Sequence, residues 1–164
     1  MSERTYNILF LCTGNSARSI MAECIMNSEG LGRFKAFSAG SFPAGRVHPY
    51  TLETLQHMYL SVEGLRSKSW SEFTQPDAPA MDFVLTVCDQ AAGEVCPVWP
   101  GHPISAHWGV EDPVAVAESE DAKRKAFHDA FLILKRRIDL FLSLPHAALD
   151  RMALHHEVQQ VGQQ

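Results

Sequence analysis

Two residues that could do chemistry together, a cysteine and an arginine, lie in the segment LFLCTGNSARS, residues 9–19. Cys12 ends an apolar run, and Arg18 follows after five small or polar residues. A cysteine thiolate is a strong nucleophile. A guanidinium presents a planar fork of donors that matches two oxygens of a tetrahedral oxyanion. The pair predicts a loop that binds an oxyanion and places sulfur beneath its central atom. The competing interpretation is a buried structural cysteine beside a surface arginine.

The elements around this loop support the oxyanion interpretation. Tyr6–Leu11 is a short apolar run typical of a buried strand, and residues 19–29 carry apolar side chains at helical spacing. The loop then lies at a helix N-terminus, where free N–H groups and the helix dipole attract anions and lower the pKa of Cys12. The residues expected to contact the oxyanion are Thr13, Gly14, Asn15, Ser16, Ala17, Arg18 and Ser19.

The rest of the chain alternates between strand and helix patterns. Further strands are predicted at residues 34–38, 83–87 and 104–108, and helices at 49–58, 67–73 and 121–142. This alternation is typical of an α/β domain with a parallel sheet. We expect residues 1–144 to form one such domain, and residues 145–164 to form a tail that is disordered or a loosely attached helix.

Three more candidate groups follow predicted strands. Cys88 comes directly after the strand at 83–87, and Asp112 follows the strand at 104–108. The carboxyl ends of parallel strands meet at one edge of a sheet, so both groups should lie on the same side as Cys12. Cys96 lies in a loop rich in glycine and proline, which could bring it to that edge.

Composition limits the cellular compartment and the binding partners that we expect for this protein. The chain has 164 residues and a net charge of -5, so it should repel nucleic acid and anionic membranes. Its N-terminus lacks the apolar segment of a signal peptide, and we expect a cytoplasmic protein. Thiols stay reduced in the cytoplasm, so the four cysteines are expected to be chemical or buried rather than a disulfide framework.

The motifs resemble a known superfamily. CTGNSARS, followed by Met21-Ala22-Glu23 and later by Ser38-Ala39-Gly40, resembles the low-molecular-weight tyrosine phosphatases, and in particular their arsenate reductase branch. The resemblance extends over roughly residues 6–142. It implies an open, four-stranded parallel sheet flanked by helices, a Rossmann-like three-layer arrangement.

The resemblance also implies a reaction. Cys12 would attack arsenate, Asp112 would act as general acid, and the disulfide would pass from Cys12–Cys88 to Cys88–Cys96. Thioredoxin, or glutaredoxin with glutathione, would restore the thiols, and no tightly bound cofactor is expected. An optional potassium site is implied near Asn15, Glu23 and Ser38, and no other metal.

Two alternatives remain open. A low-molecular-weight tyrosine phosphatase would use Cys12, Arg18 and Asp112 and ignore Cys88. Such phosphatases usually carry an aromatic residue after the Asp-Pro pair, where this chain has Val114. The other alternative is a non-catalytic module that binds phosphate or senses oxidation through a disulfide. Many relatives also carry a second loop cysteine where this chain has Ala17, a position that the relay does not need.

Overall fold

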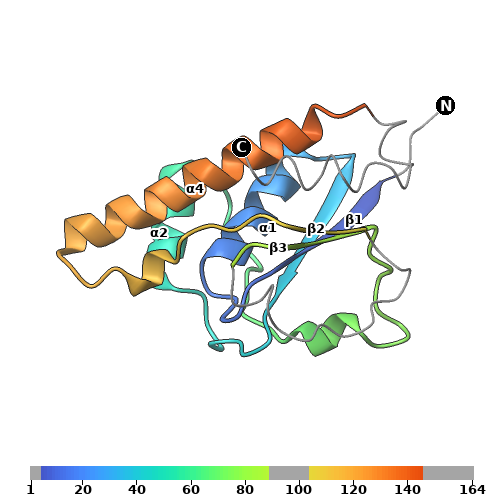
Figure 1. Cartoon of the computed structure of the whole chain (residues 1–164), viewed down its shortest axis with the longest axis horizontal. Helices are drawn as coiled ribbons and strands as arrows, with labels where there is room; N and C mark the ends of the chain where they lie inside the picture. The colour runs from blue at the N-terminus through green and yellow to red at the C-terminus, as the bar shows by residue number, and fades with distance from the viewer. Residues whose placement is uncertain (1–4, 89–103, 146–164) are drawn as a thin grey trace.

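The computed structural model describes residues 5–88 and 104–145, which form a four-stranded parallel sheet covered by helices (Figure 1). The strands are β1 (Tyr6–Leu11), β2 (Phe34–Ala39), β3 (Phe83–Thr86) and β4 (Ile104–His107), in the spatial order β2-β1-β3-β4. The α-helices are α1 (Arg18–Glu29), α2 (Pro49–His57) and α4 (Glu120–Leu142). The described residues also form two short 3-10 helices, η1 (Trp70–Phe73) and η2 (Pro113–Ala115).

The predicted fold class and most predicted elements are confirmed. Strand β1 has the expected bounds, and the other strands and the α-helices differ from the prediction by one residue at an end. The predicted helix at residues 67–73 shortens to η1, because Ser69 caps it by accepting from the Ser71 N–H. The predicted tail lies outside the described residues, apart from residue 145.

The two faces of the sheet are covered differently. One face carries Ile8, Phe10 and Leu85, which pack with α1, α2 and the long helix α4 in the main core. The apolar stripe of α4 is buried as its periodicity predicts, and consists of Phe127, Ala130, Phe131, Leu134, Ile138 and Phe141. The other face has a smaller core, and among the described residues its cover is η1 rather than an α-helix.

All strands are parallel, so their carboxyl ends form one edge. Strand β1 pairs with β2 on one side and with β3 on the other, which brings Leu11 opposite both Ala39 and Thr86. Thr86 in turn lies opposite His107 of β4. The segments after β1, β3 and β4 therefore begin side by side. Within residues 5–88 and 104–145, no helix is long and apolar enough to cross a membrane.

Candidate active site

The loop between β1 and α1 is held in shape by a buried asparagine. Asn15 has a φ of 45°, a left-handed conformation that asparagine tolerates. Its Nδ2 donates to the Ser19 Oγ at 2.8 Å and to the Ser38 Oγ at 3.0 Å, and its Oδ1 accepts from the Lys68 N–H at 2.8 Å. Since Asn15 is fully buried, these bonds fix the turn that follows Cys12.

A lysine lies where the resemblance implied potassium. The Lys68 Nζ lies 3.4 Å from the Ser38 Oγ and 3.7 Å from the Glu23 Oε1, and donates to the Arg66 carbonyl at 3.0 Å. Its side chain is only 7 % exposed. This ammonium lies beside two of the three residues expected near the ion, and its positive charge would repel a second cation. With Lys68 in this place, the residues around Glu23 and Ser38 do not fit a potassium ion.

Replacing Lys68 by methionine is expected to lower the free energy of unfolding by about 2 kcal/mol, because Glu23 loses its cationic partner in a largely buried position. Chemical denaturation measures the change. Lys125→Met is the matched control, since the Lys125 pair with Asp129 is exposed. Adding Glu23→Gln to the Lys68 variant should recover stability. An unchanged single variant would contradict the structural role of this ammonium.

Arg18 links the loop to the segment after β4. Its Nη1 donates to the Val110 carbonyl at 2.8 Å, and its Nη2 lies 3.5 Å from the Asp112 Oδ2. Its Nε is buried and has no hydrogen-bond partner among the described residues. A buried guanidinium N–H is costly to leave unpaired, so the donor set fits an oxyanion that bonds to Nε and Nη2.

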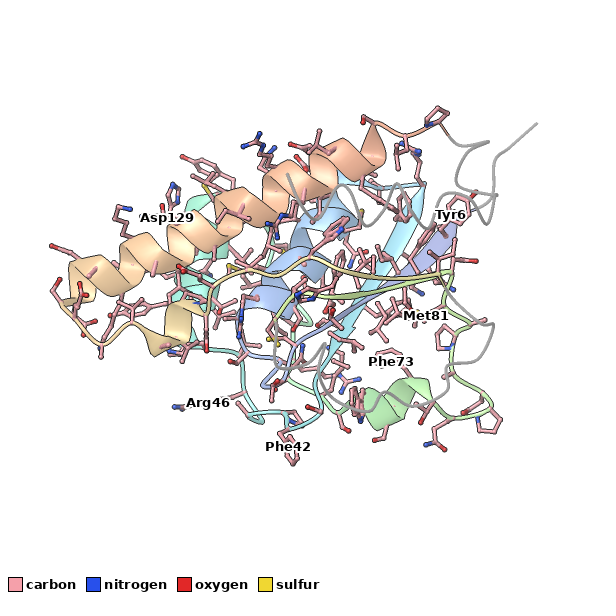
Figure 2. All side chains as sticks on the ribbon, viewed as in Figure 1. Tyr6, Phe42, Arg46, Phe73, Met81 and Asp129 are labelled. Atoms are coloured by element: carbon pink, nitrogen blue, oxygen red, sulfur yellow. The ribbon has the colours of Figure 1, made fainter. Side chains whose placement is uncertain are left out.

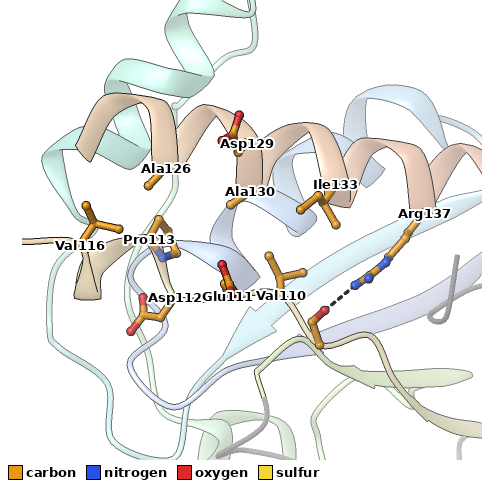
Figure 3. Close-up of a pocket in the computed structure, with 11 residues that line it drawn as sticks. Val110, Glu111, Asp112, Pro113, Val116, Ala126, Asp129, Ala130, Ile133 and Arg137 are labelled. Atoms are coloured by element: carbon orange, nitrogen blue, oxygen red, sulfur yellow. Dashed lines mark hydrogen bonds between the residues drawn. The ribbon is translucent and has the colours of Figure 1, made fainter. Parts of the chain in front are cut away.

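The segment that carries Asp112 is anchored from two sides. The Arg137 Nη1 donates to the Gly109 carbonyl at 2.7 Å, next to the Val110 carbonyl that Arg18 holds. The Asp112 Oδ1 caps η2 by accepting from the Val114 N–H at 3.0 Å. A pocket of about 320 Å³ lies between this segment and α4, and the Asp112 carboxylate points away from α4 (Figure 3). Asp112 thus lies beside Arg18, while the pocket lies behind it.

The two thiols expected to react lie together. Cys12 and Cys88 are both buried, and the Cys88 side chain is close enough to Cys12 to shift its pKa. The Thr13 Oγ1 also lies 3.7 Å from the Cys88 sulfur. The hydrogen bond with Cys88, together with burial, raises the pKa of Cys12 well above its usual range, although Arg18 opposes this. The expectation of a lowered pKa was therefore wrong for this arrangement, because a neighbouring thiol outweighs the loop's positive field.

Replacing Cys88 by alanine is expected to lower the pKa of Cys12, because the largest cause of its increase is removed. The rate of alkylation of Cys12 by iodoacetamide, followed against pH by peptide mass spectrometry, should then rise at lower pH than in the wild-type protein. Cys88→Ser, whose hydroxyl can still accept a hydrogen bond from the Cys12 thiol, should stay closer to the wild type. Identical pH profiles for all three proteins would contradict this account.

Gly40 allows the strand ends to approach closely. A Cβ atom there would overlap the Thr13 carbonyl oxygen and lie 2.7 Å from that of Cys12. Gly40→Ala is therefore expected to displace the start of the loop and to lower stability by about 2 kcal/mol. Thermal unfolding and the affinity for inorganic phosphate measure the two effects. A variant that keeps wild-type phosphate affinity would show that the loop tolerates this displacement.

The two remaining cysteines lie away from this pair, and two further residues of the site were not predicted. Cys96 lies outside the described residues, so its predicted role stays a prediction. Cys24 is buried and its thiol donates to the Ser61 carbonyl at 3.3 Å, and burial raises its pKa to about 11. Lys68 and Arg137 were missed, because a lone lysine in a loop and a basic cluster on a helix carry no signal of their distant partners.

Comparisons with known proteins agree with this geometry. Residues 7–158 match the family described as low molecular weight phosphotyrosine protein phosphatase. The arsenate reductase of Bacillus licheniformis is 35 % identical over 128 residues, which are 77 % of this chain and 86 % of that protein.

Two solved structures are also similar. An arsenate reductase from Archaeoglobus fulgidus has a TM-score of 0.59 and 27 % identity, over 80 % of this chain and 98 % of its own. A low molecular weight protein tyrosine phosphatase from T. tengcongensis has a TM-score of 0.65 and 26 % identity, over 85 % of this chain and 100 % of its own. With its loop between β1 and α1 and its parallel sheet, this chain belongs to the low molecular weight phosphotyrosine protein phosphatase family.

Proposed function

We propose that the protein reduces arsenate to arsenite with the thiols of Cys12 and Cys88. The observation that carries this proposal is the proximity of these two buried side chains at the carboxyl edge of the sheet, where Cys88 raises the pKa of Cys12 and lies 3.7 Å from the Oγ1 of the adjacent Thr13. Reduction of arsenic(V) to arsenic(III) requires two electrons, and two thiols supply them when they form a disulfide. Relatives named arsenate reductase, at about one-third identity, support the same function.

The first step forms a bond between sulfur and arsenic. Arsenate binds at the loop, where Arg18 offers Nε and Nη2 and the N-terminus of α1 offers its free N–H groups. The thiol of Cys12 gives its proton to a bound oxyanion oxygen and attacks arsenic. One arsenic–oxygen bond breaks, and Asp112 protonates the departing oxygen, which leaves as water.

The second step transfers the electrons. The sulfur of Cys88, as the thiolate, attacks the sulfur of Cys12, and the sulfur–arsenic bond breaks. The electron pair of that bond stays on arsenic, which leaves as arsenite, and a Cys12–Cys88 disulfide remains. The burial of both thiols protects the adduct from water, which would otherwise hydrolyse it back to arsenate.

The third step returns the enzyme to its thiol form. Cys96 attacks the sulfur of Cys88, which frees Cys12 and gives a Cys88–Cys96 disulfide. An external thiol carrier then reduces this disulfide; we favour thioredoxin, with glutaredoxin and glutathione as the other source. Such a cycle requires a reducing compartment, which agrees with a cytoplasmic location.

Steady-state production of arsenite tests this function. Arsenate turnover is measured with thioredoxin, thioredoxin reductase and NADPH, and in parallel with glutaredoxin, glutathione and glutathione reductase. Turnover with either carrier supports arsenate reduction, and the faster carrier identifies the donor. No arsenite with either carrier, in a preparation whose three thiols are reduced, would refute it.

A phosphatase is the second candidate, because Arg18 and Asp112 lie together beside Cys12 as phosphate-ester hydrolysis requires. Hydrolysis of p-nitrophenyl phosphate without any thiol carrier tests it. A kcat/KM for the ester that exceeds the value for arsenate would make the phosphatase the principal activity.

A further inference from the structure

The loop that binds the oxyanion is braced by the segment after β2. Four hydrogen bonds run from this segment to loop carbonyls: Phe42 N–H to Thr13 at 3.0 Å, Ala44 N–H to Gly14 at 2.8 Å, His48 N–H to Ser16 at 3.0 Å and Thr51 Oγ1 to Ser16 at 2.8 Å. Figure 2 shows Phe42 and Arg46 projecting outward from this segment. Because its carbonyls are held on this side, the loop can direct N–H groups toward an anion.

His48 is the junction between this brace and helix α2. Its N–H donates to the Ser16 carbonyl, and its own carbonyl accepts from the N–H groups of Thr51 and Leu52 at 2.9 and 3.3 Å. Its Nδ1 accepts from the Tyr50 N–H at 3.1 Å and so caps α2. The ring packs at 4.9 Å between centroids on Phe127 of α4. His48 therefore caps the helix that carries Thr51, one of the two donors to the Ser16 carbonyl, and its own N–H is the other.

We infer that His48 positions the oxyanion-binding loop, and that it does so only as the neutral imidazole whose Nδ1 accepts from the Tyr50 N–H. Protonation would place a hydrogen on Nδ1. Two donors, this N–H and the Tyr50 N–H, would then face each other, and the cap would be lost. With the cap weakened, the two hydrogen bonds to the Ser16 carbonyl are no longer held in register. The inference concerns the loop, and rests on the proposed function only in taking this loop as the oxyanion site.

The surroundings of the ring favour its neutral form. Burial and the positive charges of Arg46 and Lys123 lower the pKa of His48, and Asp112 opposes them. From the elements packed around it, the ring also meets Tyr50 of α2 and Phe127 of α4, neither of which carries a charge at neutral pH. At neutral pH the cap is therefore intact, and acid releases it.

Three variants distinguish the role of His48 as the cap of α2 from the effect of its charge. His48→Asn keeps an acceptor at the cap but does not titrate, His48→Ala removes the acceptor, and His128→Asn makes the same change at an exposed histidine of α4. The probe is sulfate, which stays a dianion over the pH range used. At neutral pH, we expect His48→Ala to bind sulfate about fivefold more weakly than the wild type, and the two asparagine variants to match it.

A second readout does not depend on activity or on ligand. The backbone amide resonances of Ser16 and Ala17 should move with pH at the midpoint of the His48 ring resonance in the wild type and in His128→Asn. They should lose that transition in His48→Asn. If the loop amides keep it without His48, or never show it, the inference is overturned, even where His48→Ala fails to fold. A missing arsenate reductase activity would leave both readouts intact and would refute only the proposed function.

Discussion

Replacing Cys88 by serine is expected to abolish multiple-turnover arsenate reduction while hydrolysis of p-nitrophenyl phosphate survives. The sulfur–arsenic bond breaks only when a second thiolate attacks Cys12, and a serine hydroxyl cannot take up the electrons as a disulfide. The serine hydroxyl can still accept a hydrogen bond from the Cys12 thiol, so the loop keeps its nucleophile and its oxyanion site. Arsenite production with a thiol carrier should fall by about 10³-fold or more, as when an essential nucleophile is removed.

The matched control is Cys24→Ser, because Cys24 is also buried but bonds to the Ser61 carbonyl, away from the loop. It should keep both activities. Quantification of the Cys12–Cys88 disulfide by mass spectrometry after one equivalent of arsenate, with no carrier present, supplies an independent measurement. Equal loss of both activities in Cys88→Ser would mean that Cys88 supports the structure of the site and does not carry electrons.

The fold was largely predictable because its signals are local. The stripe of α4 and the apolar run of β1 indicate their elements from sequence neighbours alone, and the structure buries the predicted side chains. The helix at residues 67–73 was overestimated, because Ser69 and Lys68 are recruited by bonds that local periodicity does not reveal. The bond from the Lys68 N–H to Asn15 is set by tertiary structure.

The convergence of the site was predictable for a different reason. The segments after parallel strands begin at one edge of the sheet. The positions of the predicted strands along the chain were therefore enough to predict that Cys12, Cys88 and Asp112 lie close together. The electrostatics of the site could not be predicted in this way. The pKa of Cys12 is raised by the neighbouring Cys88, and the positive charge near Glu23 belongs to Lys68, which a separate loop brings to that position. Both are contacts between residues more than 40 positions apart along the chain, Lys68 and Glu23 (45), and Cys12 and Cys88 (76).

Replacing Arg18 by lysine is expected to lower kcat/KM about 10³-fold for both arsenate and p-nitrophenyl phosphate. Lysine keeps the positive charge but loses the planar fork, so it cannot bond to the Val110 carbonyl and present two donors to an oxyanion together. Steady-state kinetics measure the loss, and calorimetric titration with inorganic phosphate should show weaker binding. The effect should appear in both reactions, because both substrates are tetrahedral oxyanions at the same loop.

Arg137→Lys separates the two roles of Arg18. Arg137 anchors the same segment through the neighbouring Gly109 carbonyl, but its guanidinium lies on the far side, against the pocket under α4 (Figure 3). Weakening that anchor should cost only the value of one hydrogen bond, about 1 kcal/mol of stability, and a small loss of kcat. Equal kinetic losses in the two variants would make Arg18 a second anchor for Asp112. A far larger loss for Arg18→Lys would indicate that the oxyanion binds to the Arg18 Nε, which has no hydrogen-bond partner among the described residues.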